Sequence, residues 1–265
     1  MVIDFNDSNH NFLDSGDRTT MNSPDIGEQA ISKAAEVGLE SQLDEADELD
    51  VDVRTNPADL MQGEIDSVSV KGEGLVMQQE LRAEKIRIET GDIDINPIKA
   101  ALGNIELESP SDARMLVVLK EEDIQRAFDS DYVMDKLQNL KIAAGGEKTT
   151  ANINKVKFQL PEENKVSLEA DIELTEQNRQ EQINFSAVPE VSSDGTKINL
   201  NSVEYEHEAE HNQEIARAVI DSAEEILDLR NFELEEMSMR VRKLDVRLGK
   251  LTIEADDTIA DFPDA

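Results

Sequence analysis

The segment at residues 165–174, KVSLEADIEL, alternates apolar and polar side chains without a break. Its apolar positions are Val166, Leu168, Ala170, Ile172 and Leu174. A side-chain period of two is that of a β-strand with one face buried and the other in water. The charged alternate positions indicate an antiparallel sheet that is covered on one side only.

Further strands are predicted on both sides of this segment. Residues 154–160, 183–188 and 197–205 extend it to a four-stranded meander, because short turns at 161–164 and at Asp194-Gly195 separate them. Segments 49–55, 66–75 and 84–95 read as strands, and residues 232–255 as two strands joined near Gly249. The phase of residues 84–95 slips at Thr90-Gly91, which indicates a bend.

Helices are predicted at three places. One begins at Ser23 and continues past Gly38 to Ala46, because Ser23 and Pro24 form a good start signal. Residues 120–140 fit two short helices hinged near Ser130, and residues 208–228 fit a long amphipathic helix. The predicted fold class is therefore α+β, with a bent, twisted antiparallel sheet and long helices.

The predicted domain organisation is simple. Residues 1–22 are polar, acidic and aperiodic, and we expect a disordered tail there. Residues 23–260 are expected to form a single domain, with a weak subdomain seam near 143–150.

The strand at 66–75 carries an unusual apolar face. Val68 and Val70 are followed on that face by Gly72 and Gly74, where bulky side chains are expected. Either another part of the chain packs closely against these glycines, or a bound apolar molecule fills the space. Burying hydrocarbon contributes about 0.8 kcal/mol per methylene, so an acyl chain needs no polar motif to be held. Both interpretations predict the same periodicity.

The formal net charge of −34 excludes some partners. Nucleic acid is not expected, because phosphate backbones are bound by Lys and Arg surfaces. The same charge disfavours broad attraction to an anionic membrane. The chain has no cysteine, its longest apolar run is MLVVL at 115–119, and its first residues lack the pattern of a secretory signal. We therefore expect a soluble, cytoplasmic protein, with peripheral membrane contact at most.

The segment HEAEH, His207 to His211, matches the zinc-peptidase pattern H-E-x-x-H. Its polar neighbours and the lack of a later histidine favour instead a solvated first helical turn. A zinc-dependent hydrolase with His207 and His211 as metal ligands is therefore kept as an alternative. No phosphate-binding loop, nucleophile elbow or catalytic cysteine is present, and we expect no enzyme and no cofactor.

Residues 230–250 are locally basic in this acidic chain. Arg240 and Arg242 fall on one face of a predicted strand and could bind a lipid phosphate. Pairing with neighbouring acidic side chains is the favoured interpretation, because exposed ion pairs are common on such surfaces.

Three long segments carry a resemblance to a known family. They contain G-x-I-x-x-V-x-V at 63–70, L-x-x-x-D-I-x-x-A at 119–127 and L-R-N-F at 229–232. The chain resembles the LmeA-like bacterial phospholipid-binding family, formerly a domain of unknown function, from about residue 28 to residue 260. This resemblance implies a highly twisted sheet wrapped on a long helix, similar to tubular lipid-binding proteins, with phospholipid as the ligand. The best-known member acts in cell-envelope glycolipid assembly, and the family offers no agreed catalytic residues.

The sequence is best explained by a non-enzymatic lipid-binding protein, a lipid carrier or a membrane-organising factor. Ten residues are predicted to form its site: Val68, Val70, Gly72, Gly74, Ile86, Ile88, Val166, Leu168, Arg240 and Arg242. The second alternative is an acidic scaffold protein with a fully packed core and a basic partner.

Overall fold

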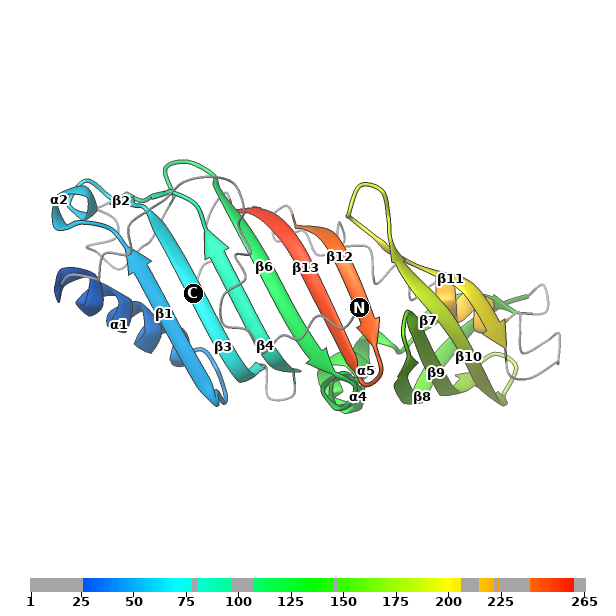
Figure 1. The fold of residues 1–265 in the computed structure, drawn as a ribbon. Coiled ribbons are helices and arrows are strands. Elements are labelled where there is room, and N and C mark those ends of the chain that lie inside the picture. Colours follow the sequence, from blue (N-terminus) through cyan, green and yellow to red (C-terminus); the bar gives the residue numbers. More distant parts are fainter. Residues whose placement is uncertain are drawn as a thin grey trace.

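The computed structural model describes residues 26–77, 81–96, 107–144, 147–205, 215–221, 224 and 239–259. These residues form an elongated molecule in which two large antiparallel sheets follow one another along the long axis (Figure 1). A two-stranded ribbon of β2 (Glu64–Ile65) and β5 (Ile93–Asp94) adds to them. The predicted antiparallel architecture is therefore confirmed.

The first sheet has six strands and contains both early and late parts of the chain. Its spatial order is β1 (Glu48–Arg54), β3 (Ser67–Met77), β4 (Leu81–Thr90), β6 (Ser111–Lys120), β13 (Lys250–Ile259) and β12 (Arg240–Arg247). Strand β4 ends where the phase slip at Thr90-Gly91 was predicted, and Ile93 then pairs with β2.

The second sheet has five strands and confirms the predicted meander. Its order is β11 (Ile198–Tyr205), β10 (Arg179–Val191), β9 (Lys165–Leu174), β8 (Glu147–Glu162) and β7 (Leu140–Ala144). Strand β7 was not predicted, and the proposed seam near 143–150 falls in the hairpin that β7 forms with β8. The apolar side of this five-stranded sheet packs on four helical residues and forms a closed core with them: Ile215, Ala216, Val219 and Ile220.

The helix α1 (Ile26–Glu40) lies beside β1 at one end of the six-stranded sheet (Figure 1). Ser32 Oγ accepts a hydrogen bond from the Val53 backbone N–H at 2.9 Å, and a Glu28 carboxylate oxygen accepts one from the Thr55 N–H at 3.3 Å. These side chains therefore satisfy backbone donors that an edge strand would otherwise leave free. The predicted continuation of this helix to Ala46 is wrong, because Glu45 already bridges to Val76 of β3.

The other helices are short in the described part of the chain. Helix α2 (Pro57–Leu60) is capped by Asn56, whose side-chain oxygen accepts from the Ala58 and Asp59 N–H groups. Helices α4 (Glu121–Asp129) and α5 (Asp131–Lys136) meet at Ser130, as predicted. Long helices wrapped by a sheet, the other half of the predicted fold, are not observed among the residues that the structure describes. The predicted tail at 1–22 lies outside them.

Strand β12 joins the two sheets. Its Val241 N–H donates to the carbonyl of Gly195 at 2.9 Å, and its Val246 carbonyl accepts from the Asn164 N–H at 3.0 Å. Gly195 has a φ of +76°, and a Cβ there would lie 2.8 Å from the Val241 carbonyl oxygen. Only glycine permits this close approach, which brings the β10–β11 turn onto the six-stranded sheet.

Candidate functional site

One face of the six-stranded sheet is apolar across its width. Residues paired across antiparallel strands project from the same face, so the register defines continuous rows. One row contains Val51, Val70, Ile88, Met115, Ala255 and Val241, and the next contains Leu49, Gly72, Ile86, Val117, Ile253 and Leu244. We call this surface the apolar face.

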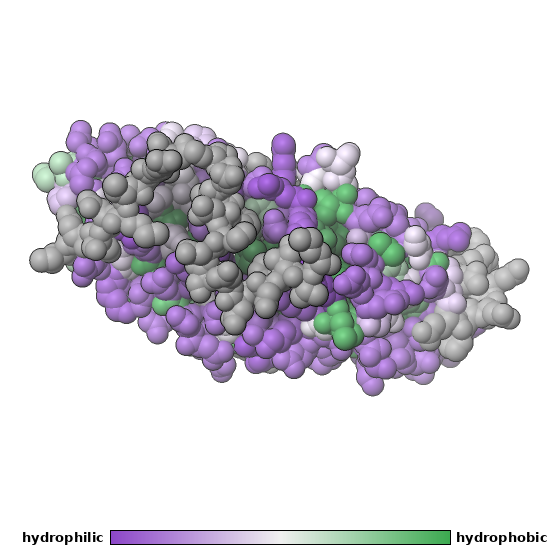
Figure 2. Space-filling view, viewed as in Figure 1, coloured by the Kyte–Doolittle hydropathy of each residue, from purple (hydrophilic) through white to green (hydrophobic). Residues whose placement is uncertain are grey.

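The apolar face is buried at its two ends and half-buried in its middle. Val51 and Val53 are buried on β1, where α1 lies, and Val241 and Val246 are buried at the junction of the sheets. The half-buried residues lie on β3, β4, β6 and β13: Val68, Val70, Ile86, Ile88, Met115, Val117 and Ile253. In Figure 2, hydrophobic atoms are visible near the middle of the molecule, and hydrophilic atoms line much of its upper and lower edges.

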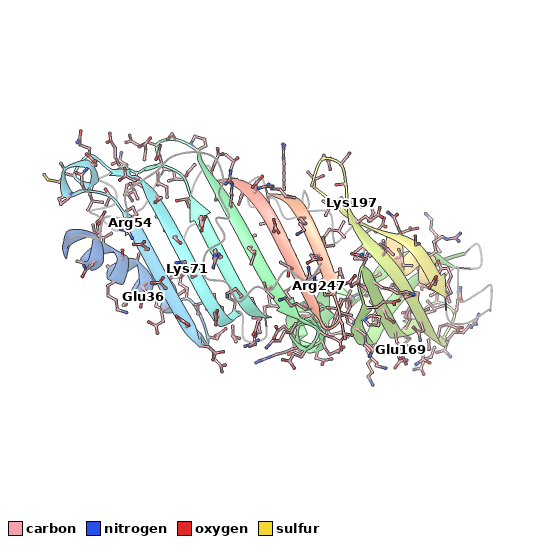
Figure 3. All side chains as sticks on the ribbon, viewed as in Figure 1. Glu36, Arg54, Lys71, Glu169, Lys197 and Arg247 are labelled. Atoms are coloured by element: carbon pink, nitrogen blue, oxygen red, sulfur yellow. The ribbon has the colours of Figure 1, made fainter. Side chains whose placement is uncertain are left out.

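The opposite face of the same sheet carries cross-strand ion pairs, and we call it the outer face. Lys71 faces Asp50 at 3.8 Å, Lys85 faces Glu73 at 2.9 Å, and Lys243 faces Glu254 at 3.5 Å. Figure 3 shows Lys71 on β3 together with many other charged side chains along the two sheets. The sheet is therefore two-sided in chemistry, with water-compatible side chains on one face and half-buried hydrocarbon on the other.

A charged network bounds the end of the sheet at which α4 begins. Arg82 binds Asp123 at 2.8 Å and Glu84 at 3.1 Å, and Lys120 binds Glu84 at 2.8 Å. The hydrogen bond to Asp123 is the main cause that raises the pKa of Arg82, and the bond from Lys120 is the main cause that lowers the pKa of Glu84. Only 3% of Asp123 is exposed, so this end is held by buried, paired charge.

A cleft of about 610 Å³ lies at the other end of the same strands. Its lining combines the end of β4, the start of β6, the start of β12 and the end of β13: Glu89, Thr90, Gly91, Asp112, Ala113, Arg114, Arg240, Asp256, Asp257 and Thr258. Thr90, Ala113 and Asp257 form the row that follows Ile88, Met115 and Ala255 on the apolar face. Glu89, Arg114, Asp256 and Arg240 pair across the strands in the alternate row, so these charged lining residues project from the outer face.

The space beside the two glycines of β3 is filled by the chain itself. A Cβ at Gly72 would lie 2.5 Å from Leu75 Cδ1, and a Cβ at Gly74 would lie 1.9 Å from Asp47 Oδ2. Gly74 has a φ of +60°, which interrupts the alternation of the strand and makes Leu75 and Val76 consecutive buried residues. Neither glycine thus opens an empty slot in the sheet.

The structure brings only some of the predicted site residues together. Val68, Val70, Ile86 and Ile88 are neighbours on the apolar face, whereas Val166 and Leu168 belong to the second sheet, where they pack in or against its closed core. Met115, Val117 and Ile253 of the apolar face were not predicted as site residues. The run MLVVL and the alternation in β13 show that these segments are apolar. No pattern in the sequence, however, indicates that β6 pairs with β4 and β13.

The two predicted arginines lie at the cleft end of the sheet. Arg240 faces Asp256 of β13 and lines the cleft. Arg242 lies at a bulge and binds Asp256 at 3.3 Å, as the ion-pair interpretation expected. Arg114 also approaches Asp256, at 4.0 Å.

The H-E-x-x-H segment with His207 and His211 lies outside the described residues. Within the described ranges, no group of three or more His, Asp or Glu side chains is arranged to hold a metal ion. The helices of these ranges also include none that is long and apolar enough to cross a bilayer.

A half-buried apolar face on a one-sided antiparallel sheet is compatible with a binding site for an apolar ligand. The comparison with family models agrees with a site of this kind: the model described as LmeA-like phospholipid-binding matches residues 25–256. The chain belongs to the LmeA-like phospholipid-binding family. No curated protein and no solved structure matches it.

Proposed function

We propose that this chain is a non-enzymatic phospholipid carrier that holds acyl tails against the apolar face. The observation that supports this most is the half-burial of adjacent apolar side chains on four neighbouring strands, β3, β4, β6 and β13. Contiguous apolar surface of this kind normally marks a ligand or partner site, because water disfavours its exposure. Membership of a phospholipid-binding family supports a lipid as that ligand.

The dimensions of the apolar face suit a lipid tail. Ala113 to Leu119 on β6 covers six residue steps, or roughly 20 Å at about 3.3 Å per residue. One leaflet of a bilayer core is roughly 15 Å deep, so an acyl tail can lie along a strand within this length. At about 0.8 kcal/mol per methylene removed from water, ten methylenes contribute about 8 kcal/mol before the entropic cost of binding is subtracted.

A carrier must also release its lipid. The central residues of the apolar face are half-buried rather than enclosed, so a lipid can enter and leave while both sheets stay folded. The outer face carries the solvent contacts through its cross-strand ion pairs. The proposed role is therefore reversible uptake of single phospholipid molecules from a membrane.

Gentle purification followed by native mass spectrometry and lipid extraction tests the binding step. We expect close to one phospholipid per chain, and transfer of a fluorescent phospholipid from donor to acceptor vesicles in proportion to protein concentration. Spectra that show only the bare chain mass, together with no transfer, would contradict the proposal.

A further inference from the structure

We infer that the hydroxyl group of Ser111 binds the ester carbonyl of a lipid on the apolar face, so that the protein prefers ester-linked lipids to ether-linked ones. This inference rests on the proposed function, since it names a contact of the same lipid at the point where its tail joins the glycerol. Three observations carry it: the face from which Ser111 projects, its place at the end of that face, and the hydrogen-bonding state of its hydroxyl.

The register of β6 places Ser111 on the apolar face. Strand β6 pairs with β13 over its whole length without a shift. Ser111 is therefore in phase with Ala113 and Met115, which belong to rows of the apolar face. The intervening Asp112 projects from the outer face. A group that binds Ser111 is thus on the same side of the sheet as the proposed tails.

Ser111 also lies at one end of the apolar face, next to the cleft. Ala113, two residues further along β6, lines the cleft and begins the stretch of β6 proposed for a tail. Two residue steps in a strand cover roughly 7 Å. The carbonyl carbon of an ester is the first carbon of the acyl chain. A tail that lies along β6 from Ala113 toward Leu119 therefore brings its ester carbonyl beside Ser111.

The hydroxyl of Ser111 is buried and, among the described residues, has no hydrogen-bond partner. Only 3% of Ser111 is exposed. Buried polar groups without a partner are rare in native proteins, and each calls for a specific explanation. A serine hydroxyl can donate its hydrogen to a carbonyl oxygen. An ester carbonyl that lies against Ser111 therefore supplies the acceptor that this hydroxyl needs.

Two other polar side chains occupy the adjacent row of the apolar face, and neither offers a donor to an ester. The Thr90 hydroxyl accepts from the Val68 N–H at 2.9 Å and donates to the Val68 carbonyl at 3.4 Å. The carboxylate of Asp257 only accepts hydrogen bonds. Its negative charge also disfavours a phosphate at this position, which leaves the neutral ester as the group next to Ser111.

The donors at the opposite end of the apolar face already have partners. Arg82 binds Asp123 at 2.8 Å. Lys120 binds Glu84 at 2.8 Å. An ester carbonyl at that end would have to compete with a carboxylate for its donor, whereas Ser111 would gain a partner. The lipid is therefore oriented with its ester at the Ser111 end.

The test compares two lipids that differ only in their linkage: dioleoylphosphatidylcholine, which has two esters, and its dioleyl diether analogue, which has none. The full chain is stripped of lipid and incubated with vesicles that contain equal amounts of both, and native mass spectrometry measures which lipid is bound. We expect wild type to bind the diester about fivefold more than the diether.

Two variants assign this preference to Ser111. Ser111→Ala should bind the diester and the diether equally, with binding of the diether as in wild type. Ser69→Ala is the matched control, because it removes a hydroxyl from the outer face of β3, and it should keep the wild-type preference.

A stability measurement separates a contact with lipid from a structural role. Without lipid, Ser111→Ala should be at least as stable as wild type in urea unfolding, because alanine removes a buried polar group that is not satisfied. A clear loss of stability would show that the hydroxyl is bound within the chain, and would overturn the inference.

The other failures are distinguishable from one another. Equal binding of diester and diether by the wild type, a preference that Ser111→Ala retains, or the same loss in Ser69→Ala overturns the inference. These results leave the proposed function intact, because the tails are still bound. A wild type that binds neither lipid overturns the proposed function itself.

Discussion

The side chain of Leu75 occupies the space that the missing side chain of Gly72 leaves on the apolar face. A Cβ on Gly72 would approach Leu75 Cγ and both its methyl carbons to between 2.5 and 2.9 Å. Leu75 is only 4% exposed, so it has little freedom to move away. The glycine in the strand therefore makes room for a neighbour in the same strand, and the proposed lipid would contact the valines and isoleucines around it.

Gly72→Ala is expected to destabilise the fold by about 1–3 kcal/mol, because the added methyl overpacks a buried site. Gly38→Ala is the control: Gly38 lies in α1 with nothing within 4 Å of its Cβ position, and alanine there should stabilise by about 0.5–1 kcal/mol. Urea unfolding measures both. Unchanged stability of Gly72→Ala would mean that the space beside Gly72 is open.

Strand alternation made most of the fold predictable. The segments around Val51, Val70, Ile88 and Leu168 were assigned correctly because a one-sided sheet imposes a period of two on the sequence. Alternation also predicted a continuous face through Gly74. That expectation fails locally because a positive φ turns the chain, and a glycine in the sequence does not reveal its φ.

The assignment of strands to sheets could not be predicted from local patterns. Val166 and Val68 have the same periodicity, yet they lie in different sheets, because the six-stranded sheet is completed by β12 and β13 from the far end of the chain. Pairing over such separations depends on tertiary packing, which local propensity does not encode. The apolar face could therefore be predicted in part, as Val68, Val70, Ile86 and Ile88, but not its β6 and β13 half.

A cysteine-free chain permits a direct test of which face meets lipid. Val70→Cys places a label on the apolar face, and Lys71→Cys places the same label one residue away on the outer face. With a fluorescent label at each site, phospholipid with brominated acyl chains should quench the fluorescence strongly at residue 70 and little at residue 71. Equal quenching at the two positions would place the lipid elsewhere.

The buried carboxylate at the α4 end of the sheet should be important for stability. Asp123 accepts hydrogen bonds from Arg82 at 2.8 Å and from the Lys120 backbone N–H at 2.9 Å. Asp123→Ala removes both and should cost about 2–4 kcal/mol, because it leaves a partly buried guanidinium with fewer partners. Glu122→Ala, at the exposed neighbouring position, should change stability by less than about 0.5 kcal/mol in the same thermal or urea unfolding experiment. Similar effects of the two variants would contradict this role of Asp123.

Glu176 should make the second sheet sensitive to acid. Its carboxylate accepts hydrogen bonds from the Thr150 N–H and from the Thr150 and Thr149 hydroxyls, and these lower its pKa from 4.5 to about 2, with the Thr150 N–H as the largest cause. A pKa that is lower in the folded state gives stability that is fully present above pH 4.5 and is lost as the pH falls toward 2. Glu176→Gln should therefore be less stable than wild type at neutral pH, and the difference between their urea midpoints should shrink between pH 4.5 and 2. Glu163→Gln removes the same charge from the β8–β9 turn, at the other end of β9, and is the control for the change in charge alone. A constant difference for Glu176→Gln would show that the threonine contacts do not depend on its charge.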